Sequence, residues 1–209
     1  MDLVSKKWRS IKALNRILAE YPLDLGENML EVGGGSGWAS CLIKSKYPKT
    51  RIVLTDISKQ SLEQVDVWER HFGAGPDEVM VMDAKALRFA DASFDSVLVF
   101  ASLHHMHEKE ETLSEMHRVL QPGGTLMVLY EPSYPSFWLV RENGKYLRCR
   151  EEDGYVSPKR YLQLLGATGF SPRMYEYDQG PKEGVISRIA KGFKISLRPS
   201  SLVILAKKS

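Results

Sequence analysis

The chain has 209 residues, 43% of them hydrophobic and 26% charged, and a formal net charge of +3 at pH 7. This composition is ordinary for a soluble globular protein and excludes a disordered, collagen-like or coiled-coil chain. No apolar run approaches the roughly 18–20 residues that a membrane-spanning helix needs, so we expect no membrane segment. The length suits a single compact domain, which we expect to occupy residues 1–209.

Residues 1–22 have the pattern of an amphipathic helix, with apolar side chains near one face and lysine or arginine elsewhere. The apolar positions are Leu3, Ile11, Leu14 and Leu18. The segment lacks the continuous apolar core of a secretory signal. Because it precedes the first strand, we expect residues 1–25 to form a helical lid over the site.

The two cysteines, Cys41 and Cys149, lie far apart and show no paired spacing. This arrangement argues against a disulfide framework and against a zinc site. It favours a reducing compartment, so we expect a cytoplasmic protein that holds no metal.

Short apolar runs alternate with longer amphipathic segments along most of the chain. The strand-like runs lie at residues 29–33, 51–56, 78–83, 94–102, 125–132, 173–178 and 201–208. Strands that alternate with helices indicate βαβ units, and near-continuous apolar runs indicate strands buried on both faces. We therefore predict an α/β fold, a doubly wound, mostly parallel seven-stranded sheet with a C-terminal antiparallel hairpin.

Local signals mark the ends of several helices. Ser58 is expected to cap a helix whose apolar residues recur at helical spacing. Residues 108–120 have a helical pattern that Pro122 and the two glycines after it should end. Ser157, followed by Pro158, is expected to cap a further helix.

Residues 131–157 form a long connection that is rich in aromatic residues and punctuated by proline and glycine. Insertions of this length are usually lids or binding loops, so we expect this one to lie over an acceptor site. Its aromatic side chains and Glu131 either line that site or form a small core of their own. The aromatic residues in and beside it are Tyr130, Tyr134, Phe137, Trp138, Tyr146 and Tyr155.

The stretch LEVGGGSGWAS, residues 30–40, places four glycines within five positions, directly after an apolar run and before a helical segment. Bare backbone at this point lets a ligand approach the start of a helix, at the carboxyl edge of the sheet. The dinucleotide pattern G-x-G-x-x-G fails because Trp38 stands where its third glycine is needed. A phosphate-binding G-K-[ST] sequence is also absent, so a pyrophosphate ligand is disfavoured and a dehydrogenase is only a distant alternative.

The string Glu31-x-Gly33-x-Gly35-x-Gly37 resembles motif I of the class I S-adenosylmethionine-dependent methyltransferases, which have a Rossmann-like fold. FADASFDSVLVFASLHHM (89–106) resembles a signature of the subgroup that includes quinone-biosynthesis and many small-molecule methyltransferases. RVLQPGG (118–124) resembles the family's run into its fifth strand, and LLGATGF (164–170) the helix end before its last hairpin. The resemblance covers roughly residues 28–209.

The resemblance implies S-adenosylmethionine as the methyl donor, S-adenosylhomocysteine as the product and a small molecule as the acceptor. Asp56 would accept hydrogen bonds from both ribose hydroxyls, as one carboxylate is able to do, and Asp83 would lie near the adenine amino group. Either acid has a plainer alternative, because Asp56 also suits a helix cap and Asp83 a turn. The expected cofactor contacts are Glu31, Gly33, Gly35, Gly37, Asp56, Ile57, Asp83, Ala84 and Ala101.

Three histidines follow the fourth strand, close to where the resemblance places the transferred methyl group. His104 or His105 would serve as a general base if the acceptor must lose a proton. The alternative is structural, with one imidazole packed against the cofactor loop and the others on the surface. A metal site is not expected there, since no carboxylate or cysteine is placed to complete it.

Residues 181–209 carry seven lysines or arginines against one glutamate, a net charge of +6. A basic segment of this kind either binds an acidic partner or is a solvated face, and we favour the second. A methyltransferase of RNA or protein is therefore the alternative to a small-molecule enzyme. A cofactor-binding protein without catalysis is a further one. The sequence leaves the oligomeric state open.

Overall fold

The computed structural model describes residues 3–21, 23–133, 139–142, 145–148, 156–177 and 200–208. Its helices are α1 (Leu3–Glu20), α2 (Trp38–Lys46), α3 (Lys59–Leu62), α4 (Val65–Phe72), α5 (Lys109–Val119) and α6 (Pro158–Ala167), with a 3-10 turn η1 (Leu103–His105). The strands are β1 (Asn28–Val32), β2 (Arg51–Asp56), β3 (Glu78–Val81), β4 (Phe94–Phe100), β5 (Leu120–Ser133), β6 (Leu139–Glu142), β7 (Lys145–Arg148), β8 (Phe170–Tyr177) and β9 (Ser200–Lys208).

The described strands form a seven-stranded sheet in the order β3-β2-β1-β4-β5-β9-β8. The pairs from β3 to β5 are parallel, and β9 runs antiparallel to both β5 and β8. The predicted α/β architecture and its C-terminal antiparallel hairpin are therefore confirmed. The strand order reverses between β1 and β4, which is where open sheets of this kind bind their ligands.

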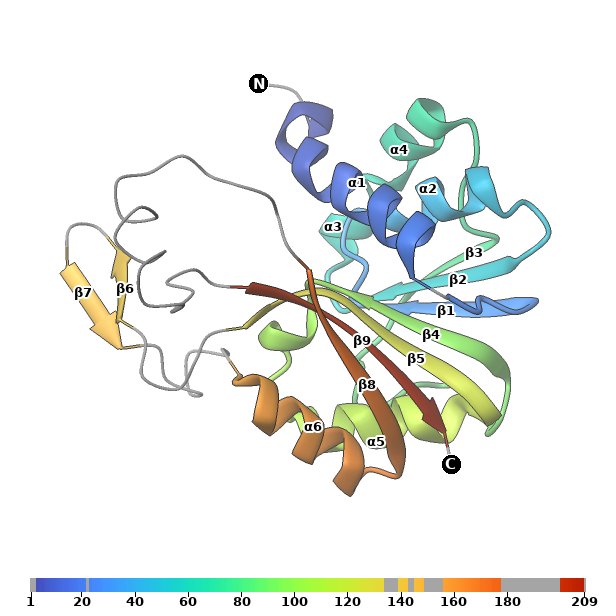
Figure 1. Ribbon diagram of the computed structural model, residues 1–209. Coiled ribbons are helices and arrows are strands. Elements are labelled where there is room, and N and C mark those ends of the chain that lie inside the picture. The colour runs from blue at the N-terminus through green and yellow to red at the C-terminus, as the bar shows by residue number, and fades with distance from the viewer. Residues whose placement is uncertain are drawn as a thin grey trace.

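Helices cover both faces of the sheet (Figure 1), with α1, α2 and α4 on one face and α5 and α6 on the other. Each face has its own apolar core, because successive residues of a buried strand point to opposite sides. Met29 of β1 joins the core under α1 and α2, whereas its neighbour Leu30 joins the core under α5 and α6. The near-continuous apolar strands of the sequence reflect this double burial.

Helix α1 is anchored mainly by buried side chains from Ile11 onward. Ile11, Leu14 and Ile17 are buried, whereas the residues from Val4 to Ser10 are partly or fully exposed. The expected amphipathic helix is thus present. Among the described residues, none of the helices is long and apolar enough to cross a membrane.

The structure differs from the sequence-based expectation at several boundaries. The helix expected after Ser58 is divided into α3 and α4, because the hydrogen bonds from Gln64 to Ser61 and from Val67 to Gln64 span only three residues. Ser58 still caps its start by accepting a hydrogen bond from the backbone N–H of Ser61. Strand β5 begins at Leu120, earlier than expected, because Leu120 already pairs with β4.

Strands β6 and β7 pair antiparallel within the insertion, as a hairpin that the sequence did not predict. Cys41 is buried. Several expectations fall outside the described residues. These are the predictions for Tyr134, Phe137, Trp138, Cys149 and Tyr155, and for most of the basic segment 181–209.

Glu31 of β1 positions the start of α2 from within the core. Its side chain is buried and accepts hydrogen bonds from the hydroxyl and the backbone N–H of Ser40, in the first turn of that helix. A carboxylate at a helix N-terminus is favourable, but removal from water is costly for its charge. Burial therefore raises the pKa of Glu31 to about 7, and the nearby charge of Asp56 acts in the same direction.

This shift makes a pH-dependent contribution to stability. The folded protein holds the Glu31 proton up to a pH of about 7, whereas the unfolded chain releases it near 4.5. Rising pH across that window therefore favours unfolding, by at most about 1.4 kcal/mol per pH unit. We predict that Glu31→Gln, which cannot ionise, gains roughly 3 kcal/mol of stability relative to wild type between pH 4.5 and 7.5.

Urea denaturation of both proteins across this pH range measures the difference. Glu27→Gln, which removes an exposed carboxylate just before the same strand, is the control and should follow wild type. Parallel stability curves for wild type and Glu31→Gln would contradict the prediction.

Candidate functional site

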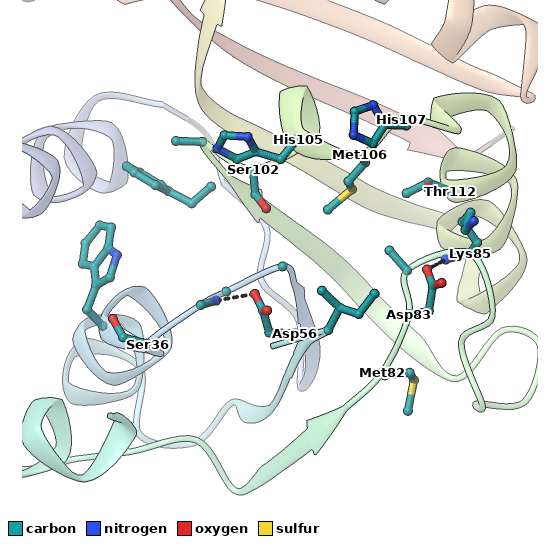
Figure 2. Close-up of a pocket in the computed structure, with 18 of the residues that line it drawn as sticks. Ser36, Asp56, Met82, Asp83, Lys85, Ser102, His105, Met106, His107 and Thr112 are labelled. Carbon is teal, nitrogen blue, oxygen red and sulfur yellow. Dashed lines mark hydrogen bonds between the residues drawn. The ribbon is translucent and has the colours of Figure 1, made fainter. Parts of the chain in front are cut away.

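A cavity of about 530 Å³ opens at the carboxyl ends of β1, β2 and β4, the point where the strand order reverses. The glycine loop after β1, the ends of β2 and β4, the loop after β3 and helix α1 contribute to its wall. Figure 2 shows side chains from the glycine loop, the ends of β2 and β4 and the loop after β3 around the opening. The volume lies in the range of small-molecule sites, about 300–1,000 Å³.

The glycine loop meets the cavity at Gly35 and packs against the protein at Gly37. Gly35 has a φ of 58°, and a Cβ added there would contact nothing within 4 Å, so open space adjoins its α-carbon. Gly37 has a φ of 75°, and an added Cβ would lie 2.7 Å from Leu54 and 2.8 Å from Val65. Glycine at 37 is therefore needed for the close packing of β2 and α4 against the loop.

Asp56, at the end of β2, holds the loop in place. One of its carboxylate oxygens accepts a 2.8 Å hydrogen bond from the backbone N–H of Gly35, drawn in Figure 2. The other accepts a 2.8 Å bond from the N–H of Ser58 at the start of α3. The helix-start contact expected as an alternative is thus present. Each oxygen keeps a second lone pair for a ligand, because a carboxylate has about four acceptor sites.

Asp83 follows β3 and lies on the same wall of the cavity. Its carboxylate accepts a 3.0 Å hydrogen bond from the N–H of Lys85, so it also stabilises a turn. In Figure 2, Asp56 lies between Ser36 and Asp83. Ile57 is 70% exposed although it is a large apolar side chain, and it lines the cavity beside these acids.

Seven of the nine expected cofactor contacts line this cavity: Gly33, Gly35, Asp56, Ile57, Asp83, Ala84 and Ala101. Glu31 and Gly37 are set back from its wall. Glu31 lies behind Gly34, on which an added Cβ would be 2.7 Å from the Glu31 carboxyl carbon. The structure thus brings the motif together, and cofactor contact at each position stays a prediction.

The two candidate histidines have different surroundings. His105 lines the cavity, whereas His104 donates its backbone N–H to Glu131 at 2.6 Å and holds its Nδ1 2.7 Å from the same oxygen. The two imidazole rings lie 3.8 Å apart between centroids. Burial, and then the neighbouring His104, lowers the pKa of His105, so this ring is neutral near pH 7.

Glu131 is the centre of a buried polar cluster beside the site. Its side chain is fully buried and also accepts a 3.1 Å hydrogen bond from the Tyr161 hydroxyl, while its Oε2 has no partner among the described residues. A register shift between Leu129 and Glu131, with Tyr130 at a φ of 57°, directs this carboxylate inward. Bulges often change the direction of side chains next to active sites. The strained backbone of Tyr130 persists because the surrounding structure holds it in place.

Residues 1–25 were expected to cover the site as a helical lid, but none of their side chains was predicted to line the cavity. Lys7 and Ser10 line it, and the Lys7 ammonium lies 5.9 Å from the centroid of the Trp38 ring. The available signal was a lysine bordering the apolar face of an amphipathic helix, which is a common pattern and specifies no contact. Within the described part of the chain, no three His, Cys, Asp or Glu side chains form a group able to hold a metal ion.

Comparison with known proteins agrees with this geometry. Residues 30–128 match the family model described as a methyltransferase domain. The ubiquinone/menaquinone biosynthesis C-methyltransferase UbiE of Escherichia fergusonii is 35% identical over 123 residues, which cover 56% of this chain and 49% of the relative. The chain thus spans about half the length of the curated relatives it matches.

Solved structures share the fold at low sequence identity. The [4+2]-cyclase SpnF has a TM-score of 0.69 and 20% identity, over 96% of this chain and 81% of its own. A second structure is the Haemonchus contortus phosphoethanolamine N-methyltransferase 2, solved with phosphomonomethylethanolamine and S-adenosylhomocysteine. It has a TM-score of 0.68 and 17% identity, and the match covers 97% of this chain and 52% of that protein. Residues 30–128 thus resemble a methyltransferase domain, with similarity to the quinone-biosynthesis C-methyltransferases, and the chain shares its fold with these solved structures.

Proposed function

We propose that this chain binds S-adenosylmethionine in the cavity beside α1 and transfers its methyl group to a small-molecule acceptor. The observation that carries the proposal is the convergence of the glycine loop, Asp56 and Asp83 on one cavity at the switch point of the sheet. The match of residues 30–128 to a methyltransferase domain supports the same donor.

Groups along the cavity wall are complementary to different parts of this donor. Asp56 offers carboxylate oxygens to the two ribose hydroxyls, and Asp83 lies on the side assigned to adenine. The exposed Ile57 would be covered by the flat base, which removes apolar surface from water. Gly35 leaves room for the methionine end to approach the backbone.

When bound, S-adenosylmethionine would supply an electrophilic methyl group to a lone pair of the acceptor and would leave as S-adenosylhomocysteine. The protein must align the two reactants and, for an O–H or C–H acceptor, remove a proton. We assign that proton to His105, which is neutral and faces the cavity. Glu131 fixes the orientation of His104, the ring next to it.

The first test concerns the donor site. Asp56→Asn should weaken S-adenosylhomocysteine binding by about 1–3 kcal/mol, because it removes the charged acceptor for ribose and loosens the hold on Gly35. Calorimetric titration measures the change, and thermal unfolding checks that the variant is folded. Asp66→Asn, at an exposed position of α4, should bind like wild type. Unchanged affinity in Asp56→Asn would remove Asp56 from the site.

The second test concerns the acceptor. Incubation with S-adenosylmethionine and separate pools of quinols, other phenols, amines, peptides and RNA, followed by mass spectrometry, should give a methylated small molecule. Methylation of RNA or peptide alone would favour the alternative that uses the basic segment. Formation of no methylated product, despite donor binding, would favour a non-catalytic or SpnF-like role.

With an acceptor identified, His105→Asn should lower kcat by about 10²-fold or more, the usual contribution of a positioned base. Because the pKa of His105 is lowered, the wild-type rate should rise with pH and reach half of its plateau value below pH 6.5. His71→Asn, on the exposed side of α4, is the control. A full rate in His105→Asn would exclude this residue as the base.

A further inference from the structure

Two lysines border the cavity, and they differ in their partners. Lys85 is 3.3 Å from a carboxylate oxygen of Glu108, an ion pair on the rim. Lys7 has no carboxylate within ion-pair distance among the described residues, and its ammonium lies over the ring of Trp38. The cavity wall therefore contains a cation whose charge is not matched by an adjacent acid.

The surroundings of Lys7 make this unmatched charge costly. The side chain is half-buried, and removal from water lowers its pKa. Glu31 attracts the ammonium from within the core, but burial keeps this carboxyl protonated up to a pH of about 7. A partly buried cation without a close partner favours the binding of an anion. The anion's negative charge would compensate for the hydration that the cation loses on burial.

Lys7 borders the cavity with its ammonium over the ring of Trp38, the first residue of α2. In Figure 2, Ser36, two residues before Trp38, and Asp83 lie on opposite sides of Asp56. The cavity wall thus combines an acidic part around Asp56 and Asp83 with a basic group on α1. S-adenosylmethionine has a matching polarity, with hydroxyl and amino donors on its nucleoside and a carboxylate on its amino-acid end.

We propose that Lys7 binds the carboxylate of the donor's amino-acid end and so makes the closure of α1 depend on that carboxylate. The inference rests on the proposed function, because it assumes the same donor. Helix α1 is anchored by Ile11, Leu14 and Ile17, whereas the side chains of residues 4–10 are partly or fully exposed. An ion pair at Lys7 would hold this weakly anchored part of the helix against the ligand.

The test compares two ligands and two variants. S-adenosylhomocysteine contains the carboxylate, whereas 5′-methylthioadenosine keeps the nucleoside and sulfur but lacks the amino-acid end. Lys7→Met removes the charge and retains a flexible apolar stem over Trp38. Lys6→Met removes the same charge from the neighbouring exposed position and is the matched control.

We expect Lys7→Met to bind S-adenosylhomocysteine at least tenfold more weakly than wild type and 5′-methylthioadenosine with unchanged affinity in calorimetric titration. Lys6→Met should match wild type for both ligands. In hydrogen exchange, S-adenosylhomocysteine but not 5′-methylthioadenosine should protect residues 4–10 in wild type, and this protection should disappear in Lys7→Met.

Equal affinity of wild type and Lys7→Met for S-adenosylhomocysteine would overturn the inference. Equal losses for both ligands would also overturn it, because they indicate a general disturbance of α1. Failure of the wild-type protein to bind either ligand would contradict the proposed function itself, which separates the two failures.

Discussion

The hydrogen bond from the Gly35 backbone N–H to Asp56 is the contact on which the site depends. It joins the loop after β1 to the end of β2, and a second bond from Gly34 to the carbonyl of Thr55 reinforces the junction. Parallel pairing of β1 between β2 and β4 brings these strand ends together, so the cavity is a consequence of the sheet's order. Gly33, Gly35 and Gly37 have positive φ values, which glycine adopts without the steric cost that a side chain imposes, and this explains why the motif is so rich in glycine.

Buried carboxylates of different character lie on either side of this junction. Glu31 supports the start of α2 from behind the glycine loop, and its burial favours the protonated form. Glu131 gathers His104 and Tyr161 at the end of β5. Burial of a carboxyl group costs desolvation free energy, which hydrogen bonds offset here. The same hydrogen bonds fix the positions of the segments around the cavity. The two acids thus link the core to the donor side and to the proposed proton-accepting side.

Much of this arrangement was predictable from the sequence, for identifiable reasons. Strand and helix order followed from apolar periodicity, and the position of Asp56 followed from the end of a strand. The partners of Glu131 were not predictable, because His104 and Tyr161 lie 27 and 30 positions away and meet it only through a bulge at Tyr130. The position of Lys7 in the cavity wall was also not predictable. Helical periodicity indicates which face of a helix is buried, but it does not indicate which residues that face contacts. Pairing of β6 with β7 depends on a register that turn-rich sequence does not specify.

The central claim is that the glycine loop and Asp56 form a site for S-adenosylmethionine and not for a dinucleotide. Calorimetric titration of the wild-type chain with S-adenosylhomocysteine and, separately, with NAD tests it most directly. We expect saturable one-to-one binding of S-adenosylhomocysteine and no heat of binding with NAD. Binding of NAD without binding of S-adenosylhomocysteine would contradict it.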